Sequence, residues 1–201
     1  MIFLVGLTTS VLLSFLIPLY LKNKYSEYPL NKINIGCITI LNLVIYLLIT
    51  YKLNVRIFED NTVSLYIYYF LCSIISSCLA TSFVIDILFK ELPDENNLMI
   101  GISLFIISML SMNYKVIITS IILFVIFFVI SVLTNQFGMG DVKMMAMMAL
   151  GFNPDKIVSF IFMSCLLAVI YSTLKIIVTK NKKDTNMAFG PFLIMSFLMI
   201  I

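Results

Sequence analysis

The sequence predicts an all-α integral membrane protein, a bundle of about eight transmembrane helices of which some are short. Of its 201 residues, 62% are apolar and only 11% are charged, and the mean hydropathy is +1.11. A soluble domain of this length has too little interior to bury so much apolar surface, so lipid must replace water as its solvent. Several stretches of roughly 20 mainly apolar residues recur between short polar breaks, which is the length that spans a membrane.

Eight spans follow one another along the chain, and together they predict a single polytopic domain over residues 1–201. The first, Met1–Leu21, has no charge and lacks the basic region and cleavage site of a secretory signal, so we interpret it as a retained helix. The others are Ile33–Tyr51, Ser64–Phe89, Leu98–Met112, Val116–Thr134, Asp141–Phe152, Ile157–Thr179 and Phe189–Ile201. The fourth, sixth and eighth are short, which suits half-helices inside a bundle or a locally thin bilayer.

The basic residues predict how the chain is oriented in the membrane. One set of alternating loops carries nine lysines, namely Lys22, Lys24, Lys32, Lys90, Lys143, Lys175, Lys180, Lys182 and Lys183. The other set carries four basic residues, namely Lys52, Arg56, Lys115 and Lys156. Since cytoplasmic loops are enriched in lysine and arginine, we expect the first set inside the cell and both termini outside. The net charge of +3 then reflects topology and gives no reason to expect nucleic acid as a partner.

Several classes of chemistry are excluded by residues that the sequence lacks. It contains no histidine, so Ser–His and Cys–His nucleophiles and His-ligated metals are unavailable. Its four cysteines form no C-x-x-C pair, and no glycine-rich nucleotide loop is present, so we expect no metal site and no nucleotide cofactor. Carboxylate chemistry remains. Eight of the ten acids lie in polar segments that we interpret as loops, namely Glu27, Glu59, Asp60, Glu91, Asp94, Glu95, Asp155 and Asp184.

The two remaining acids, Asp86 and Asp141, lie in or against apolar sequence. Asp86 precedes the end of its span by one turn, where an ionised group costs up to roughly 2.5–3.5 kcal/mol unless it faces a cavity or the bundle interior. Asp141 follows Gly138-Met139-Gly140, and these glycines allow a sharp turn that places Asp141 at a helix start. Taken singly, Asp141 could be a helix N-cap and Asp86 a snorkelling residue.

The expected topology places both aspartates at the cytoplasmic ends of their helices, at the same depth. Two carboxyls that meet there can share one proton, because neighbouring like charges cannot both ionise cheaply. The ionised member can activate a water, and the protonated member can polarise a scissile carbonyl, without a metal or a cofactor. Helix dipoles favour the ionised form for Asp141 at a helix start and the protonated form for Asp86 near a helix end.

Three motifs resemble those of the type IV prepilin peptidases. Gly138–Lys143 reads G-M-G-D-V-K and is similar to that family's G-x-G-D-x-K segment. Asp86, with Leu92-Pro93-Asp94 downstream, resembles the family's first aspartate and its following (I/L)-P-(D/N). Phe189–Phe192 reads F-G-P-F and resembles the stretch that begins the family's last helix.

The resemblance implies a membrane aspartic endopeptidase whose catalytic pair is Asp86 and Asp141. It implies substrates that are type IV prepilins or pseudopilins, cleaved after a basic leader at the cytoplasmic face of the inner or plasma membrane, and leaves pilus assembly, secretion and DNA uptake open as the role. The catalytic core would span about residues 64–201, and residues 1–63 would be a two-helix amino-terminal part. Residues implied to support the site or the substrate are Gly138, Gly140, Lys143, Pro93, Gly190 and Pro191.

One part of the chain departs from the longer members of that family. Those members carry two C-x-x-C pairs in a loop after the first helix, whereas Lys22–Lys32 contains no cysteine. Many members also methylate the new pilin terminus with S-adenosylmethionine, and we do not expect this activity here. For proteolysis itself, the resemblance implies no cofactor.

Some alternatives remain open at this point. A small ion- or proton-coupled transporter could use Asp86 and Asp141 as its ion site, although no internal repeat supports it. A related peptidase could act on preflagellins or other membrane substrates. Lys143 either holds the charge of Asp141 or snorkels to the membrane edge. The acids Glu91, Asp94 and Glu95 either attract a basic leader or are simply solvated.

Overall fold

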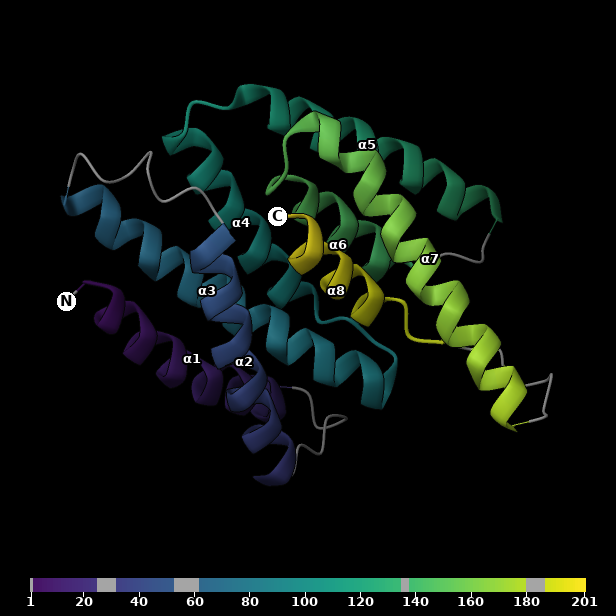
Figure 1. Cartoon of the computed structure of the whole chain (residues 1–201), viewed down its shortest axis with the longest axis horizontal. Coiled ribbons are helices and arrows are strands. Elements are labelled where there is room, and N and C mark those ends of the chain that lie inside the picture. Colours follow the sequence, from purple (N-terminus) through teal and green to yellow (C-terminus); the bar gives the residue numbers. More distant parts are fainter. Residues whose placement is uncertain (1, 25–31, 53–61, 135–137, 180–186) are drawn as a thin grey trace.

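The computed structural model describes residues 2–24, 32–52, 62–134, 138–179 and 187–201, which form eight helices and no strand (Figure 1). The helices are α1 (Ile2–Lys24), α2 (Lys32–Lys52), α3 (Thr62–Phe89), α4 (Asp94–Leu110), α5 (Tyr114–Thr134), α6 (Met139–Ala149), α7 (Pro154–Thr179) and α8 (Gly190–Ile200). Each expected span corresponds to one helix. Arg56, Lys180, Lys182 and Lys183, and the acids Glu27, Glu59, Asp60 and Asp184, lie outside the described residues.

The helix lengths confirm an all-α membrane bundle with short members. Five described helices, α1, α2, α3, α5 and α7, are long and apolar enough to cross a membrane. The other three, α4, α6 and α8, have 17, 11 and 11 residues, and they are the three that the sequence predicts to be short. The chain is therefore a multi-pass membrane protein in which short helices accompany the long spans.

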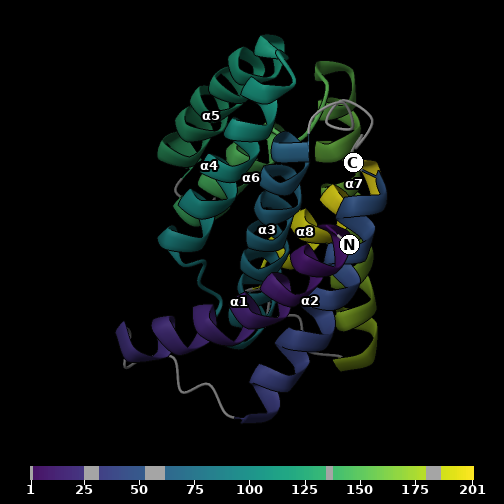
Figure 2. The ribbon, with the colours of Figure 1, turned by 90° about the vertical axis from the view of Figure 1, so that its left-hand side faces the viewer.

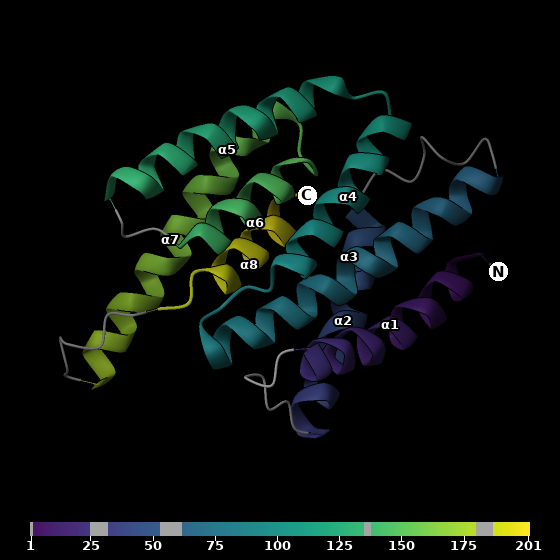
Figure 3. The same cartoon turned by 180° about the vertical axis from the view of Figure 1, so that it is seen from behind.

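α3 is the central helix of the bundle. Most of its apolar length is buried, whereas most of each of the other four long helices faces outward. α1 and α2 pack on one side of it, and α4 packs on another side, toward α5 (Figures 1 and 2). The short helices α6 and α8 lie inside the arrangement, where α5 covers α6 and α7 covers α8 (Figure 3). The outer faces of the long helices carry large exposed apolar side chains, which suits contact with lipid.

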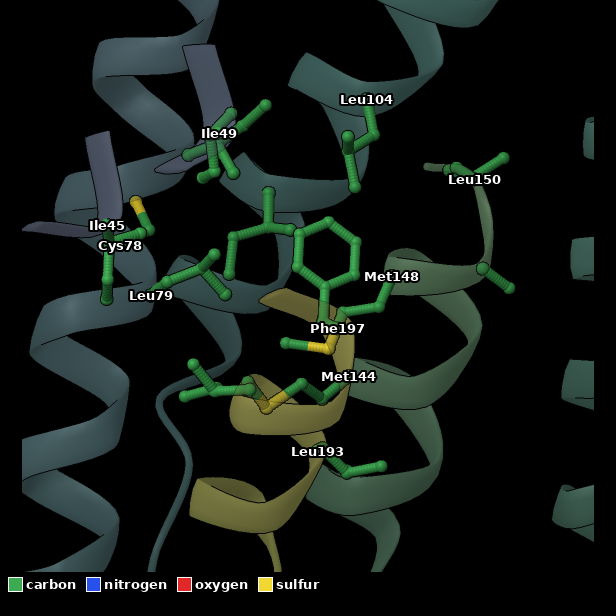
Figure 4. Packing of buried hydrophobic residues seen from close by; sticks show 14 of the residues in the cluster. Ile45, Ile49, Cys78, Leu79, Leu104, Met144, Met148, Leu150, Leu193 and Phe197 are labelled. Carbon is green, nitrogen blue, oxygen red and sulfur yellow. The ribbon is translucent and has the colours of Figure 1, made fainter. Parts of the chain in front are cut away.

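The apolar core joins the short helices to α3 and α4. Phe197 of α8 is fully buried among Leu79 of α3, Leu104 of α4 and Met148 of α6 (Figure 4). A Cβ added at Gly151, just after α6, would lie 2.9 Å from the ring of Phe197, so this close approach requires glycine. This close packing fixes the positions of α6 and α8 relative to α3.

Buried polar groups connect α1 and α2 to α3. The Asn42 amide of α2 donates hydrogen bonds to the carbonyl oxygen of Ser10 at 2.9 Å and to its hydroxyl at 2.8 Å. The hydroxyl of Ser77 on α3 donates to the same carbonyl at 3.2 Å. All three residues are buried. Because lipid provides no hydrophobic driving force between helices, hydrogen bonds of this kind help to hold α1, α2 and α3 together.

The far end of the molecule, defined by Lys52 and Lys156, holds the C-terminal end of α8. The Lys52 ammonium donates to the carbonyls of Leu198 and Met199 at 2.9 and 2.8 Å. The Lys156 ammonium donates to the carbonyl of Ile200 at 3.0 Å. Carbonyls at a helix C-terminus lack partners within the helix and carry partial negative charge, so the two cations stabilise this end.

Candidate active site

The corner between α3 and α4 places Asp86 one turn before the end of α3. The amide of Lys90 donates to the carbonyl oxygen of Asp86 at 2.9 Å, and Lys90 adopts a left-handed φ of 58° that stops the helix. The chain then turns through Leu92 to Pro93, which precedes α4 with φ −62° and ψ 126°. Proline fixes this φ, so the corner is built from residues suited to it.

Asp86 is buried and faces the start of α8. Its side chain is 3% exposed, and its Oδ2 atom has no hydrogen-bond partner within the described parts of the chain. The backbone N–H of Gly190 interacts with the carboxyl group. A Cβ on Gly190 would lie 2.5 Å from Oδ2, so only glycine allows α8 to approach this closely.

Asp141 lies in the first turn of α6, outside the five long spans. The helix begins at Met139, and Gly138 is its N-cap, with φ −62° and ψ 131°. The simple interpretation of Asp141 as an N-cap is therefore wrong, because Asp141 is the third residue of the helix. The Asp141 Oδ2 atom lies 3.0 Å from the position of a Cβ on Gly138, so the carboxyl turns back over this glycine.

The two aspartates line one cleft of about 440 Å³. Burial is the larger cause and the negative charge of Asp86 the smaller cause of a raised Asp141 carboxyl pKa, which lies at about 7. The cleft is lined by Asp86, Lys90, Glu91, Leu92, Pro93, Asp94, Gly138, Met139, Gly140, Asp141 and Lys143. Two residues 55 positions apart in the sequence thus line one cleft, and their common depth in the membrane stays a prediction. We call this end of the molecule the aspartate end.

The structure does not support the division of labour expected from helix dipoles. That expectation rested on Asp86 lying near the C-terminus of α3, but the N-terminus of α8 also points at Asp86 through Gly190. Asp141, expected to be the ionised member, is instead buried enough for its pKa to rise. The sequence could not reveal the α8 contact, because it joins residues more than 100 positions apart.

The implied supporting residues separate into two groups. Gly138, Gly140, Lys143 and Pro93 line the cleft, and Gly190 contacts Asp86. Pro191 instead lines a neighbouring apolar groove of about 400 Å³ between α3, α7 and α8. Lys90 borders both spaces, so the cleft and the groove adjoin.

Lys143 has a partner that neither sequence interpretation included. Its ammonium donates to both carboxylate oxygens of Asp94, at 2.9 and 2.8 Å. The interpretation of Asp94 and Glu95 as loop residues is wrong, since both lie in the first turn of α4, and Asp155 likewise lies in the first turn of α7. Glu91 and Asp94 line the cleft, whereas Glu95 forms an ion pair with Lys24 of α1.

Two buried asparagines beside the cleft were missed by the sequence reasoning. Asn96 and Asn97 follow Asp94 in α4 and are 1% and 2% exposed. Their signal in the sequence was the pair of uncharged amides at the start of an apolar span. Buried amides are costly in an apolar interior unless hydrogen bonds satisfy them, so these two asparagines indicate a structural or functional role.

Comparison with known protein families gives a match. The sequence model of the type IV leader peptidase family matches residues 73–173, about half of the chain. The matched region contains Asp86, the Leu92-Pro93-Asp94 segment and Gly138–Lys143, and it stops before Gly190. No curated protein and no solved structure matches the chain.

Proposed function

Because the chain belongs to the type IV leader peptidase family and is thus a membrane protease, we propose that it is an aspartic endopeptidase with Asp86 and Asp141 as its catalytic pair. Its substrates would be type IV prepilins or pseudopilins, from which it removes a basic leader. The observation that carries the proposal is a single cleft lined by the two aspartates that the sequence places in apolar surroundings. Placing two carboxyls in one cleft is costly, and an aspartic protease needs this arrangement.

The chemistry requires one proton shared between two carboxyls. The ionised carboxylate takes a proton from a water molecule, whose oxygen then bonds to the scissile carbonyl carbon. The protonated carboxyl gives its proton to the carbonyl oxygen, which yields a neutral tetrahedral intermediate. When the C–N bond breaks, the leaving nitrogen receives the proton taken from water. The other carboxylate takes back a proton from a hydroxyl of the intermediate as the carbonyl re-forms, so the pair returns to its singly protonated state. Either aspartate can fill either role in this scheme.

The charges around the cleft support a basic substrate. Asp86, Glu91, Asp94 and Asp141 line it together with the two lysines Lys90 and Lys143. With one proton on the aspartate pair, the lining carries one more negative than positive charge, which favours a cationic leader over an anionic one. The adjoining apolar groove along α3, α7 and α8 can take uncharged parts of the same chain.

The lysines support an active site that faces the cytoplasm. Lys90 and Lys143 line the cleft, and Lys175 borders the groove beside it. Lys52 and Lys156 lie at the far end, against the last turn of α8. This separation matches the two sets of loops in the sequence, and the lysine-rich set belongs inside the cell.

Methylation of the product is not part of the proposal. Proteolysis by a carboxyl pair needs water and a proton, and no cofactor enters it. A methyl transfer would need S-adenosylmethionine, and the segment Lys22–Lys32 lacks the two C-x-x-C pairs that the longer members of the family carry.

Co-expression with candidate prepilins tests the function. Wild-type protein should convert a prepilin to a product whose mass lacks the leader, and Asp86→Asn and Asp141→Asn should each abolish the conversion. Asp155→Asn is the matched control, because it removes one exposed carboxylate from the first turn of α7. The same spectrum would reveal an added methyl group.

Processing that survives both substitutions would contradict the proposal. If the two variants instead abolished a proton- or cation-dependent flux across vesicles while the wild type cleaved no prepilin, the transporter alternative would replace it. Methylation adds one CH₂ group, so a product about 14 Da heavier than the cleaved chain would show that this activity is retained.

A further inference from the structure

The first turn of α4 contacts three other helices through four consecutive polar side chains. We call these residues, Asp94–Asn97, the α4 brace. Asp94 binds Lys143 of α6, and Glu95 binds Lys24 of α1 at 2.5 Å. These two ion pairs are partly exposed, and exposed ion pairs contribute little to stability. The brace therefore depends mainly on its two buried amides.

Asn96 connects α4 to the turn of α3 that precedes Asp86. Its side-chain amide donates to the hydroxyl of Ser82 at 3.1 Å, and both residues are buried. Ser82 and Asp86 are four residues apart on a helix, so they share one face and lie one turn apart. The hydrogen bond therefore fixes the rotation of α3 where Asp86 points toward the cleft.

Asn97 connects the same turn of α4 to the start of α6. Its side-chain amide donates to the backbone carbonyl of Gly140 at 3.4 Å, and Gly140 directly precedes Asp141. A Cβ on Gly140 would lie 3.3 Å from the Cβ of Leu92, so the α3–α4 corner also packs closely against this residue. Both contacts act on the peptide next to Asp141.

Burying the two amides costs free energy, which indicates that they have a role in positioning α3 and α6. Each is almost fully buried, and the Oδ1 atom of Asn97 has no hydrogen-bond partner within the described residues. A leucine of similar volume would fill the same space without a polar group to desolvate. Directional hydrogen bonds, unlike apolar contacts, hold an angle as well as a distance.

We propose that Asn96 and Asn97 are positioning residues that set the separation of the two catalytic carboxyls. This inference rests on the proposed function. Adjacent residues of one rigid helical turn hold the two elements that carry the aspartates. A change of about 1 Å in such a geometry can lower a rate by about 10²-fold.

The test replaces both amides without opening a cavity. The variant Asn96→Leu/Asn97→Leu keeps side-chain volume, so its Tm in detergent should stay within about 4 °C of wild type. Its kcat on a prepilin should fall at least about 10-fold, while KM changes less than about twofold. Asn113→Leu is the control. Asn113 pairs with Asn153 at 2.9 Å, and both line the far-end pocket, a space of about 270 Å³ that Lys52 and Lys156 also line, so this variant should change neither constant.

A distance measurement separates this inference from the proposed function. Spin labels at Ile87→Cys and Met139→Cys, which are exposed neighbours of the aspartates, report the gap between α3 and α6 by pulsed EPR once the native cysteines are replaced by alanine. The double leucine variant should broaden or shift this distance, and Asn113→Leu should not. An unchanged distance, or an unchanged kcat in an active enzyme, would overturn the positioning role. If wild type cleaves no prepilin, the proposed function fails and the distance alone decides the role of the brace.

Discussion

At the scale of single residues, the site is defined by glycines as much as by acids. Gly190 allows the start of α8 to reach Asp86, and Gly138 leaves room for the carboxyl of Asp141. The sequence singled out both aspartates because ionisable groups are costly in apolar stretches, and Gly138 because a glycine allows a sharp turn before Asp141, whereas Gly190 followed only from the resemblance. What the glycines contact is a matter of tertiary packing, which local pattern does not encode.

Substitution of Gly190 tests this packing directly. Gly190→Ala puts a methyl group 2.5 Å from the Asp86 Oδ2 atom, so α8 or the carboxyl must move. We expect kcat/KM for prepilin cleavage to fall about 10²-fold, since a shift of this size misplaces a catalytic group. Gly36→Ala is the control, because a Cβ there meets no atom within 4 Å, and it should leave cleavage unchanged. Equal activity of the two variants would show that the α8 contact is irrelevant to catalysis.

The raised pKa of Asp141 predicts how activity depends on pH. In the proposed mechanism the active pair carries one proton, and Asp141, with a pKa of about 7, loses its proton as the pH rises through that value. We therefore expect kcat/KM to fall above about pH 7 as both carboxyls become ionised. Initial rates on a prepilin peptide between pH 5 and pH 9 would show this descending limb, and a flat profile to pH 9 would contradict it.

The raised pKa of Asp141 also predicts that removing its charge stabilises the folded protein at high pH. Since the folded pKa lies above the ordinary value of 3.8, folding is favoured while the carboxyl is protonated, and this contribution is lost as the pH rises toward 7. Asp141→Asn removes the charge, so its Tm should exceed that of wild type by about 2–4 °C or more at pH 8. At pH 4 the difference should largely vanish, and a variant less stable at pH 8 would refute the argument.

At the scale of elements, helix number and order were predictable, and several helix starts were not. Apolar runs predict the spans, and this criterion places polar first turns in loops, as with Asp94 and Glu95 at the start of α4. Because acids at a helix N-terminus are stabilised by its dipole, a charged turn can begin a helix as easily as end a loop. The consequence is functional, since the brace lies in a turn that the sequence pattern had excluded.

Glu91 at the edge of the cleft is the acid best placed to meet a basic leader. It lines the cleft in the corner between α3 and α4, whereas Glu95 lies outside the cleft lining. We expect Glu91→Gln to raise KM for a lysine-rich leader about three-fold at low salt, with kcat nearly unchanged, because exposed charges act weakly and are screened. Asp155→Asn, which removes an equal charge from the start of α7, should leave KM unchanged. Equal KM values for both variants would remove the electrostatic role of Glu91.

At the scale of the whole molecule, the bundle has two polar ends that differ in their charged side chains. The aspartate end gathers the acids and lysines of the cleft, and the far end gathers Lys52 and Lys156 around the last turn of α8. Composition was enough to predict a membrane protein with these ends, because charge must leave the lipid. Which helices lie in the centre was not predictable, since the central α3 and the enclosed α8 are as apolar as α1, α2 and α7, which face lipid.

Labelling from each side of the membrane tests the orientation. In a chain without its native cysteines, Glu91→Cys in the cleft should react with an impermeant maleimide only when the cytoplasmic face is accessible. Lys115→Cys, which lies next to the residues of the far-end pocket, should react only from the opposite face. The reverse pattern would place the cleft outside the cell and contradict the topology derived from the lysines.

The shortness of α8 has a consequence for the surrounding bilayer. Eleven residues of helix measure about 16 Å, roughly half of a typical hydrocarbon layer. Yet one tip of this helix contacts a carboxyl group and the other contacts two ammonium groups. Unless the bilayer itself is thin here, hydrated depressions would enter from both faces and come within that short distance of each other. The peptide bond to be cut would meet water at a depth where ordinary lipid would keep it dry.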